Sequence, residues 1–294
     1  MPEPLKFLAF DTSTDRMSVA VTDGVRVWQH SGPGGALASA TLIPAILALL
    51  AEAGLALDEL DAIVFGRGPG SFTGLRTACA VAQGLAFGAR QGAGIAVLPV
   101  DTLMALAEEA RFERLGAVGD SAQSTKSTKS TKTAADAGAM PFTVTALLDA
   151  RMDEMYVQRY EFSGGQWRSL GDCELIRPEN LVPEPDSRLL AGNVFGVYAG
   201  RLPAEVAAFE CVQALPSAAA LLRLAPALAA AGQCVEAALA LPLYVRDKVA
   251  LTTAERAQVK LDAAEAARAA LPLLPIHETL ETPDPGRLKP PCLP

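Results

Sequence analysis

The sequence is almost without histidine, since its only two are His30 and His277. Histidine-based metal sites use ligands at close spacing, and an HExxH helix or a similar pair cannot be built from two residues so far apart in the chain. Serine hydrolase chemistry also lacks support, because the residues around Ser71 do not match GxSxG and no histidine base accompanies them. The scarcity of histidine therefore argues against both kinds of site.

Positive charge is scarce as well: 25 Lys and Arg face 33 Asp and Glu, for a formal net charge of -8. A self-contained nucleic-acid surface normally needs clustered Lys and Arg, so we expect any RNA contact to be shared with a partner. Aromatic residues make up only 5% of the chain, whereas 50% of the residues are hydrophobic. We therefore expect a globular chain with an aliphatic core.

Cysteine is sparse and scattered. The thiols form no CxxC pair and no framework of close spacings, so we expect them to be reduced. They are Cys79, Cys173, Cys211, Cys234 and Cys292. The acidic first residues lack the basic start and apolar core of a signal peptide, and we find no uninterrupted apolar run that approaches membrane-spanning length. We expect a soluble, cytoplasmic protein.

The most distinctive stretch is a glycine-rich corner at residues 65–76. An apolar run ends at Phe65, glycines and a proline follow, and Ser71 is a candidate N-cap for a long helix. The corner lacks the Gly-Lys-Ser/Thr ending of a Walker loop, yet backbone N–H groups at a helix N-terminus can bind an anion, and Arg76 lies one turn in. An anion site and a structural hinge are both compatible with this chemistry.

A polar turn after the first strand joins this candidate. Residues 5–10 predict a strand, and the turn at 11–16 begins with Asp11 and is rich in hydroxyls. Several ATPase folds place a phosphate or metal contact at such a turn, whereas the structural alternative is that short polar side chains only cap it. The candidate anion or structural loop consists of Asp11, Thr12, Ser13, Gly68, Gly70, Ser71, Thr73 and Gly74.

Two predicted helices lack a solvated face. Residues 39–53 contain Glu52 as their only charge, and small residues recur at every fourth position late in the helix predicted at 72–89. A helix that is apolar all round is buried in the core or against another chain. We predict an interaction surface, with a large alanine-rich intramolecular core as the alternative. The predicted interface residues are Leu42, Ile46, Leu49, Leu50, Ala53, Arg76, Ala78, Ala82 and Leu85.

A charge introduced into this surface tests the prediction. We expect Leu50→Glu or Ala82→Glu to break assembly while leaving the lobe folded, because burying an unpaired charge in an interface costs several kcal/mol.

The chain repeats one arrangement of a strand, a turn that begins with Asp, and an antiparallel return, first at residues 5–21 and again at 142–162. Such a repeat indicates a duplicated two-lobe α/β fold. Three copies of Ser-Thr-Lys between the lobes predict disorder. The predicted divisions are an N-terminal lobe at 1–112, a low-complexity, disordered insertion at 113–140, a C-terminal lobe at 141–251, and a helical and then proline-rich tail at 252–294.

Several strings of residues resemble the bacterial TsaB (YeaZ) family. They are Leu-Ala-Phe-Asp-Thr-Ser-Thr at 8–14, Gly-Arg-Gly-Pro-Gly-Ser-Phe-Thr-Gly-Leu-Arg at 66–76, Asp-Ala-Arg-Met-Asp-Glu-Met-Tyr at 149–156, and Pro-Leu-Tyr-Val-Arg-Asp at 242–247. The resemblance covers about residues 5–250, and the string at 66–76 is highly specific. It implies a two-lobe, actin/Hsp70-like ATPase (ASKHA) fold whose nucleotide site is degenerate.

The resemblance also implies a function. TsaB proteins partner the related subunit TsaD, with the ATPase TsaE, to transfer a threonylcarbamoyl group onto the adenosine next to the anticodon in tRNAs that read ANN codons. TsaD carries the metal and the catalytic site, so this chain is expected to be a non-catalytic scaffold without a cofactor of its own, with ATP and metal on the partner subunits. A homodimer through N-terminal-lobe helices, contact with tRNA only through the complex, and no membrane contact are further expectations.

Two other functions remain as alternatives. A glycoprotease-like metallopeptidase predicts a bound metal, and the lack of ligand histidines weighs against it. A small-metabolite kinase of the same fold predicts tight ATP binding, and the lack of a second glycine-rich adenosine motif weighs against that. The chain also departs from the family pattern in the insertion at 113–140, in the long tail, and in the glycine-rich residues 31–35.

Overall fold

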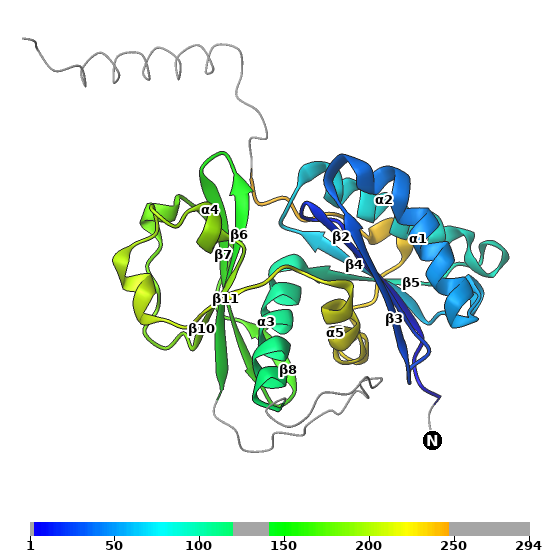
Figure 1. Ribbon diagram of the computed structural model, residues 1–294. Coiled ribbons are helices and arrows are strands. Elements are labelled where there is room, and N and C mark those ends of the chain that lie inside the picture. The colour runs from blue at the N-terminus through cyan, green and yellow to red at the C-terminus, as the bar shows by residue number, and fades with distance from the viewer. Residues whose placement is uncertain (1–2, 120–140, 247–294) are drawn as a thin grey trace, which may run out of the picture. The chain divides into compact units, whose positions relative to one another are not determined.

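The computed structural model describes residues 3–119 and 141–246. The Ser-Thr-Lys repeats and the predicted tail at 252–294 lie outside the described residues. Two mixed β-sheets organise the described part, and each is accompanied by helices (Figure 1).

The first sheet has the strand order β3-β2-β1-β4-β5. Its strands are β1 (Phe7–Asp11), β2 (Arg16–Thr22), β3 (Val27–Pro33), β4 (Ala62–Gly68) and β5 (Ala96–Asp101). The first three form an antiparallel meander, as the turn signals predict, while β1, β4 and β5 run parallel. Parallel strands end at the same edge of a sheet, so Asp11, the glycine corner and Asp101 share that edge.

The second sheet has the order β11-β10-β6-β7-β8, with β9 paired to β7. Its strands are β6 (Phe142–Arg151), β7 (Glu154–Ser163), β8 (Gln166–Ser169), β9 (Glu174–Ile176), β10 (Leu189–Gly192) and β11 (Cys211–Gln213). The long hairpin of β6 and β7 repeats the antiparallel return of β1 and β2. The predicted duplication into two sheet-based lobes is therefore confirmed.

The helices cover the sheets in layers (Figure 1). They are α1 (Ala38–Ala53), α2 (Phe72–Gly88), α3 (Thr102–Gly119), α4 (Val194–Val197) and α5 (Ala218–Ala230). Short 3-10 turns complete the chain at η1 (Gly35–Leu37), η2 (Leu57–Glu59), η3 (Ala89–Gly92), η4 (Pro178–Asn180), η5 (Ala204–Ala208) and η6 (Ala237–Leu239). Helix α3 continues to Gly119, so residues 113–119 of the insertion predicted to be disordered are helical.

Strand alternation decides which helix covers which face of the first sheet. Leu8 and Phe10 point to the side of α1 and α2, whereas Phe7 and Ala9 point to the side of α5. Successive residues of a strand face opposite sides, so the sheet lies between these two helix layers. Helix α3 packs on α5 and on the second sheet, where Leu103 and Leu106 join the core around Tyr160.

The chain after Ser217 returns to the first sheet, which the division into lobes at 1–112 and 141–251 does not anticipate. Helix α5 packs on β1, β2 and β4. Val235 then forms an antiparallel bridge with Val97, and the backbone N–H of Leu243 donates to the carbonyl oxygen of Arg67 at 2.7 Å. The return has a physical cause, because the second face of the first sheet needs an apolar cover that α3 alone does not supply.

A buried ionic network joins α3, α5 and β8. The Glu108 carboxylate is 2% exposed and accepts hydrogen bonds from Arg111, from Arg223 at 2.9 Å and from the indole N–H of Trp167 at 2.9 Å. The neighbouring Glu109 accepts from Arg223 and Ser217, each at 2.6 Å. We call these residues the Glu108 network, and it ties the helix on the first sheet to the second sheet.

Helix α1 corrects one expectation from the sequence. The stretch Gly35–Ala53 is long and apolar enough to cross a membrane by length and composition, with a hydropathy of 1.9, although we expected no such run. In the structure Leu42 and Ile46 of this stretch are fully buried against the first sheet. Only 28% of the stretch is buried, however, so much of its apolar surface has no cover in the described chain.

Candidate functional site

The glycine corner packs directly against the first polar turn. The backbone N–H of Ser71 donates to the carbonyl oxygen of Ser13 at 2.7 Å. The hydroxyl of Thr12 donates to the carbonyl oxygen of Gly74 at 2.8 Å, and the N–H of Gly68 donates to the hydroxyl of Thr102 at 3.1 Å. The structure thus brings together the two halves of the predicted loop, residues 11–13 and 68–74.

Close backbone approach explains the glycines of the corner. A Cβ at position 70 would lie 2.6 Å from the carbonyl oxygen of Ser13, and one at position 74 would lie 1.8 Å from that of Thr12. Any larger residue would push the first turn away. The Ser13 carbonyl already uses the Ser71 N–H, and the Ser71 side chain makes no capping hydrogen bond. These contacts give the corner a structural role and leave less of its backbone available to an anion.

Asp11 is the unusual residue of the corner. Its side chain is fully buried, and one carboxyl oxygen accepts from the Ser13 N–H at 2.9 Å and the Ser13 hydroxyl at 2.6 Å. The other oxygen has no hydrogen-bond partner in the described chain. It lies so close to Gly66 that a Cβ at that position would be only 1.8 Å from it. Burial raises the pKa of the Asp11 carboxyl, because a low-dielectric surrounding disfavours the charged form.

Few groups of the corner are free to hold a magnesium nucleotide of the kind that ASKHA ATPases bind. Such a site needs ionised oxygen ligands and free backbone N–H groups. Burial raises the pKa of the Asp11 carboxyl, which disfavours its ionised form, and the Ser71 N–H already donates to Ser13. Residues 3–119 and 141–246 also hold no group of three or more His, Cys, Asp or Glu positioned to bind a metal ion.

The structure places most of the predicted interface residues inside the protein. Six side chains pack in the core between the helices and the first sheet and are at most 5% exposed, namely Leu42, Ile46, Leu49, Leu50, Ala78 and Ala82. The prediction is wrong for these side chains, because the most apolar stripe of each helix turns toward its own sheet. Ala53 and Leu85 are half-buried and Arg76 is exposed, so these three stay accessible.

The outer side of the same helices is nevertheless apolar. Ile43 and Leu47 of α1 are 44% and 56% exposed, and Phe87 of α2 is 56% exposed. The exposed positions between them carry small or apolar residues, namely Pro44, Ala48, Ala51, Ala80 and Gly84. We call this surface the outer helix face. Its residues could be read from the sequence as the apolar positions left over once the i, i+4, i+7 stripe at 42, 46 and 49 is assigned to the core.

The segment 239–246, which we call the strap, lies along α2 and adds to this face. The carbonyl oxygen of Ala240 accepts from the Cys79 thiol and from the Gln83 amide, each at 3.0 Å. Its neighbours Leu239 and Leu241 are 64% and 62% exposed. The strap therefore continues the exposed apolar surface beyond α2, a feature that the sequence analysis missed because nothing local predicts where this segment lies.

Aromatic and cationic side chains anchor the strap at the start of α2. The Tyr244 ring lies 5.3 Å from the Phe72 ring, and its hydroxyl accepts from Nε of Arg76 at 3.1 Å. The Arg76 guanidinium lies 3.8 Å from the centre of the Phe72 ring. These contacts hold Arg76 in a fixed orientation on the surface of α2.

The strap ends on the second sheet. Arg246 is 14% exposed in its side chain and donates to the Glu154 carboxylate at 2.6 Å and to the carbonyl oxygen of Arg151 at 3.2 Å. Arg151, Met152 and Asp153 form the β6–β7 turn with positive φ angles. Residues 243–246 therefore connect the glycine corner of one sheet to the hairpin turn of the other.

The second Asp of the repeat is satisfied within its own lobe. Asp149 accepts from the hydroxyl of Tyr198 at 2.7 Å and from the N–H of Arg151 at 2.9 Å, and its own N–H donates to the Asn193 side chain at 2.8 Å. Burial and the hydrogen bond to Asp149 raise the pKa of the Tyr198 hydroxyl, which keeps it a donor. Asp11 and Asp149 are thus each bound by neighbours in their own lobes.

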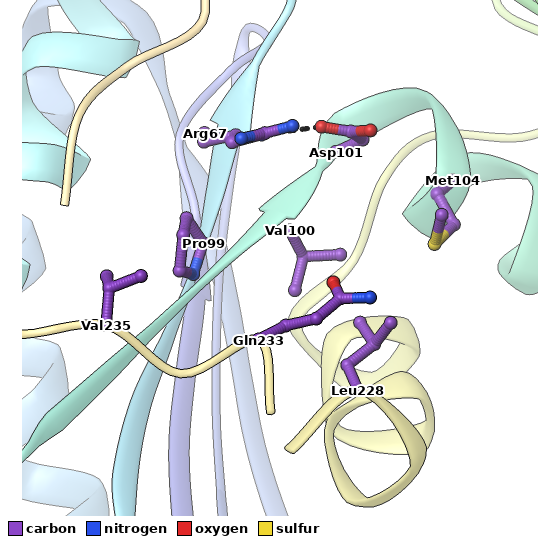
Figure 2. Close-up of a pocket in the computed structure, with 8 residues that line it drawn as sticks. All are labelled: Arg67, Pro99, Val100, Asp101, Met104, Leu228, Gln233 and Val235. Carbon is purple, nitrogen blue, oxygen red and sulfur yellow. Dashed lines mark hydrogen bonds and ion pairs between the residues drawn. The ribbon is translucent and has the colours of Figure 1, made fainter. Parts of the chain in front are cut away.

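A cavity of about 240 Å³ lies beside the end of β5 (Figure 2). Its lining residues are Arg67, Pro99, Val100, Asp101, Met104, Leu228, Gln233 and Val235. Arg67 and Asp101 form an ion pair at one side of it, with 2.6 Å between Nε and Oδ1. No free cysteine of the described chain lines the cavity, although Cys234 lies between its lining residues Gln233 and Val235.

Comparisons of the sequence and of the structure with known proteins all find TsaB, YeaZ or TsaD proteins. The family model described as "TsaD: tRNA N6-adenosine threonylcarbamoyltransferase" matches residues 37–121. The tRNA threonylcarbamoyladenosine biosynthesis protein TsaB of Haemophilus influenzae is 30% identical over 255 residues, which cover 83% of this chain and 95% of the relative. The protein of the same name from Escherichia coli is 28% identical, with 84% and 96% covered. The solved structure "YeaZ from Pseudomonas aeruginosa" is 36% identical, with a TM-score of 0.66, and covers 82% of this chain and all of that one.

Proposed function

Since the chain belongs to the TsaB (YeaZ) family, we propose that it acts in the biosynthesis of threonylcarbamoyladenosine in tRNA as a non-catalytic scaffold subunit. The complex that it serves transfers a threonylcarbamoyl group to the adenosine next to the anticodon in tRNAs that read ANN codons. The observation that carries the proposal is the outer helix face, an apolar surface on α1 and α2 without cover in the described chain.

The partner that we propose for this face is a TsaD-type subunit, with a TsaE-type ATPase joining the complex. The match to the TsaD family model over residues 37–121 supports a related fold in the two subunits. Related lobes can present similar helix faces to each other, so the same surface also suits a homodimer when the chain is alone. The formal net charge of -8 supports contact with tRNA only through the complex.

The glycine corner supports a scaffold in place of a catalyst. Residues 12–13 lie against Gly70 and Gly74 of the corner, and burial raises the pKa of the Asp11 carboxyl. We therefore place ATP and metal on the partner subunits and none on this chain. A cytoplasmic location without membrane contact follows from the tRNA substrate, with the apolar side of Gly35–Ala53 used for the partner.

Charges on the outer helix face test the proposal. Leu47 and Phe87 are both more than half exposed, so the double variant Leu47→Glu/Phe87→Glu keeps the core intact. Covering two carboxylates without partners weakens binding by about 100-fold or more. We expect loss of homodimer in light scattering, loss of copurified TsaD-type subunit, and loss of the modified nucleoside in cells that depend on this variant.

The matched control is Val182→Glu, because Val182 is 78% exposed and lies outside α1, α2 and the strap. It adds a charge to the surface of the second lobe and leaves assembly unchanged. Normal assembly and normal nucleoside levels with the double variant, or normal modification in cells without the protein, would refute the proposed function. No observation among the described residues favours the metallopeptidase or the kinase.

A further inference from the structure

The cavity beside β5 exists because a strand edge is left uncovered. Strand β5 is the outer strand of the first sheet. Val235 covers this edge at Val97 through two backbone hydrogen bonds of 2.9 and 2.8 Å. The next residues whose backbone groups face this open edge are Pro99 and Asp101, because alternate residues of a strand have the same orientation. Pro99 has no N–H to continue the ladder, so the covering segment leaves the edge and opens a space (Figure 2).

One wall of this space carries a positive and a negative charge side by side. Arg67 and Asp101 are 39% and 22% exposed, and they are joined through Nε and Oδ1. In the described chain the terminal guanidinium nitrogens of Arg67 and the second oxygen of Asp101 make no other hydrogen bond. The pair therefore offers donors and an acceptor to a ligand, and its charges cancel. A ligand with a large net charge gains little from it.

The remaining walls are apolar. Val100 lies beneath the ion pair, and Met104, Leu228 and Val235 complete the lining. The Gln233 amide is on the side opposite the ion pair (Figure 2). Ligand sites commonly combine apolar walls with a few convergent polar groups at the carboxyl edge of parallel strands. The cavity has this composition, and it lies at that edge because β4 and β5 are parallel.

The size of the cavity limits the ligand. About 240 Å³ is less than the roughly 300–1,000 Å³ of sites for drug-sized molecules, so the cavity suits a molecule smaller than a nucleotide. A molecule that matches the wall charges needs an ammonium group for Asp101 and a carboxylate for Arg67. An aliphatic side chain would contact Val100, Met104 and Leu228. We propose that this cavity binds a free α-amino acid with an aliphatic side chain, independently of the scaffold function.

Calorimetry on the full-length protein tests the site, with L-leucine and L-valine as probes. We expect saturable binding with one site per chain. Leucine methyl ester lacks the carboxylate, and N-acetyl-leucine lacks the ammonium group. Each loses one charge-assisted contact, so each should bind at least about tenfold more weakly than leucine. If either derivative binds as tightly as leucine, the proposal is overturned, because the cavity then does not recognise the charged group that the derivative lacks.

Variants of the ion pair complete the test. Asp101→Asn and Arg67→Gln should each weaken leucine binding about tenfold or more, with melting temperatures measured to show that they fold. The control is Arg26→Gln, because Arg26 also pairs with a carboxylate, that of Asp23, but lies outside the cavity. Unchanged leucine binding in both cavity variants, or no binding to the unaltered protein at millimolar concentrations, would overturn the proposal. Dimer formation and partner binding are unaffected by these variants, which separates this result from the test of the scaffold function.

Discussion

Helices α5 and α1 are similar in composition but differ in how much of their surface is buried. Both are apolar with a single charged residue, Arg223 in α5 and Glu52 in α1. In α5 the residues Leu221, Leu222 and Leu224 are all buried, because the first sheet covers one side and α3 covers another. Within the described chain, helix α1 is covered only on the sides that face the first sheet and α2. An apolar helix can therefore be an inner layer of the core or an interaction surface, and its position in the fold decides which.

The charged residue of each helix records the same difference. Arg223 is drawn into the Glu108 network, where it meets the carboxylates of Glu108 and Glu109. Glu52 is exposed. Burial of a charge requires partners. Arg223 has them on the α5 side of the sheet, whereas Glu52 on the α1 side is in contact with solvent.

The largest expected effect comes from a charge on the inner side of α1. Leu50 is 5% exposed and Leu47 is 56% exposed on the same helix. Leu50→Glu should lower the free energy of unfolding by about 4 kcal/mol or more and leave the protein largely unfolded, whereas Leu47→Glu should change it by about 0.5 kcal/mol or less. Urea unfolding followed by circular dichroism measures both values. A folded Leu50→Glu protein that only fails to assemble would show that Leu50 lies in an interface, as the sequence predicts, and that both sides of α1 are interaction surfaces.

The next largest loss of stability is expected in the Glu108 network between α3 and α5. Glu108→Gln removes the charge that faces Arg111 and Arg223 while keeping the size of the side chain. Breaking a buried ionic network typically costs about 3 kcal/mol. The control is Glu161→Gln, whose partner Arg168 is 69% exposed, and we expect a loss of about 0.5 kcal/mol or less there. Equal losses in the two variants would mean that α5 is held by apolar packing alone.

A smaller, pH-dependent effect is expected where α2 begins. The pKa of Asp11 is raised by burial, so the folded state holds a proton that the unfolded state releases above its pKa of about 3.9. Stability from this group is complete below about pH 3.9 and is lost as the pH rises through the folded-state pKa. Asp11→Asn keeps a neutral side chain, so its melting temperature relative to the unaltered protein should rise between pH 4 and pH 7.

Asp23 supplies the control with the opposite sign. Its side chain is 21% exposed, and a hydrogen bond from the Arg26 backbone N–H lowers its pKa. Its contribution is present above about pH 3.9 and is lost as the pH falls through the lower folded-state pKa, so Asp23→Asn should be more harmful at pH 7 than at about pH 3. The same trend in both variants would contradict a raised pKa of the buried Asp11 carboxyl beneath the corner.

The smallest effect is expected at the strap, which borders the open face. Tyr244→Phe removes the hydrogen bond to Arg76 and keeps the contact of the ring with Phe72. Because both groups are exposed, the loss should be about 0.5–1 kcal/mol. Tyr244→Ala, which also removes the ring, should cost more in the same urea titration. If the two variants lose equally, the hydroxyl bond alone anchors the strap.

Local patterns in the sequence predict much of this structure. Alternating apolar residues locate β1, β2 and β6, and the glycines locate the corner because a Cβ there would collide with Thr12 or Ser13. The apolar stripe of α1 at Leu42 and Ile46 is visible in the sequence, but periodicity alone does not show whether it faces a sheet or a partner. Only the packing of both helices on one sheet corrects it.

Contacts between distant residues could not be predicted in the same way. Glu108 and Arg223 are 115 residues apart, and Arg76 and Tyr244 are 168 apart. Neither pair leaves a periodic signal, because each depends on how the chain returns to the first sheet. The cavity at Arg67 and Asp101 depends on the same return, since Leu228, Gln233 and Val235 form its far walls.

The return of the chain also has a consequence for synthesis on the ribosome. Leu221 and Ala225 complete the core on one face of the first sheet, and Ala237 and Ala240 complete it on the other. The early strands therefore emerge long before the residues that cover them. Contacts of such long sequence separation slow folding and leave apolar surface exposed in the nascent chain. A nascent chain halted before Ser217 should remain bound by chaperones, even though every strand of its first sheet has already been made.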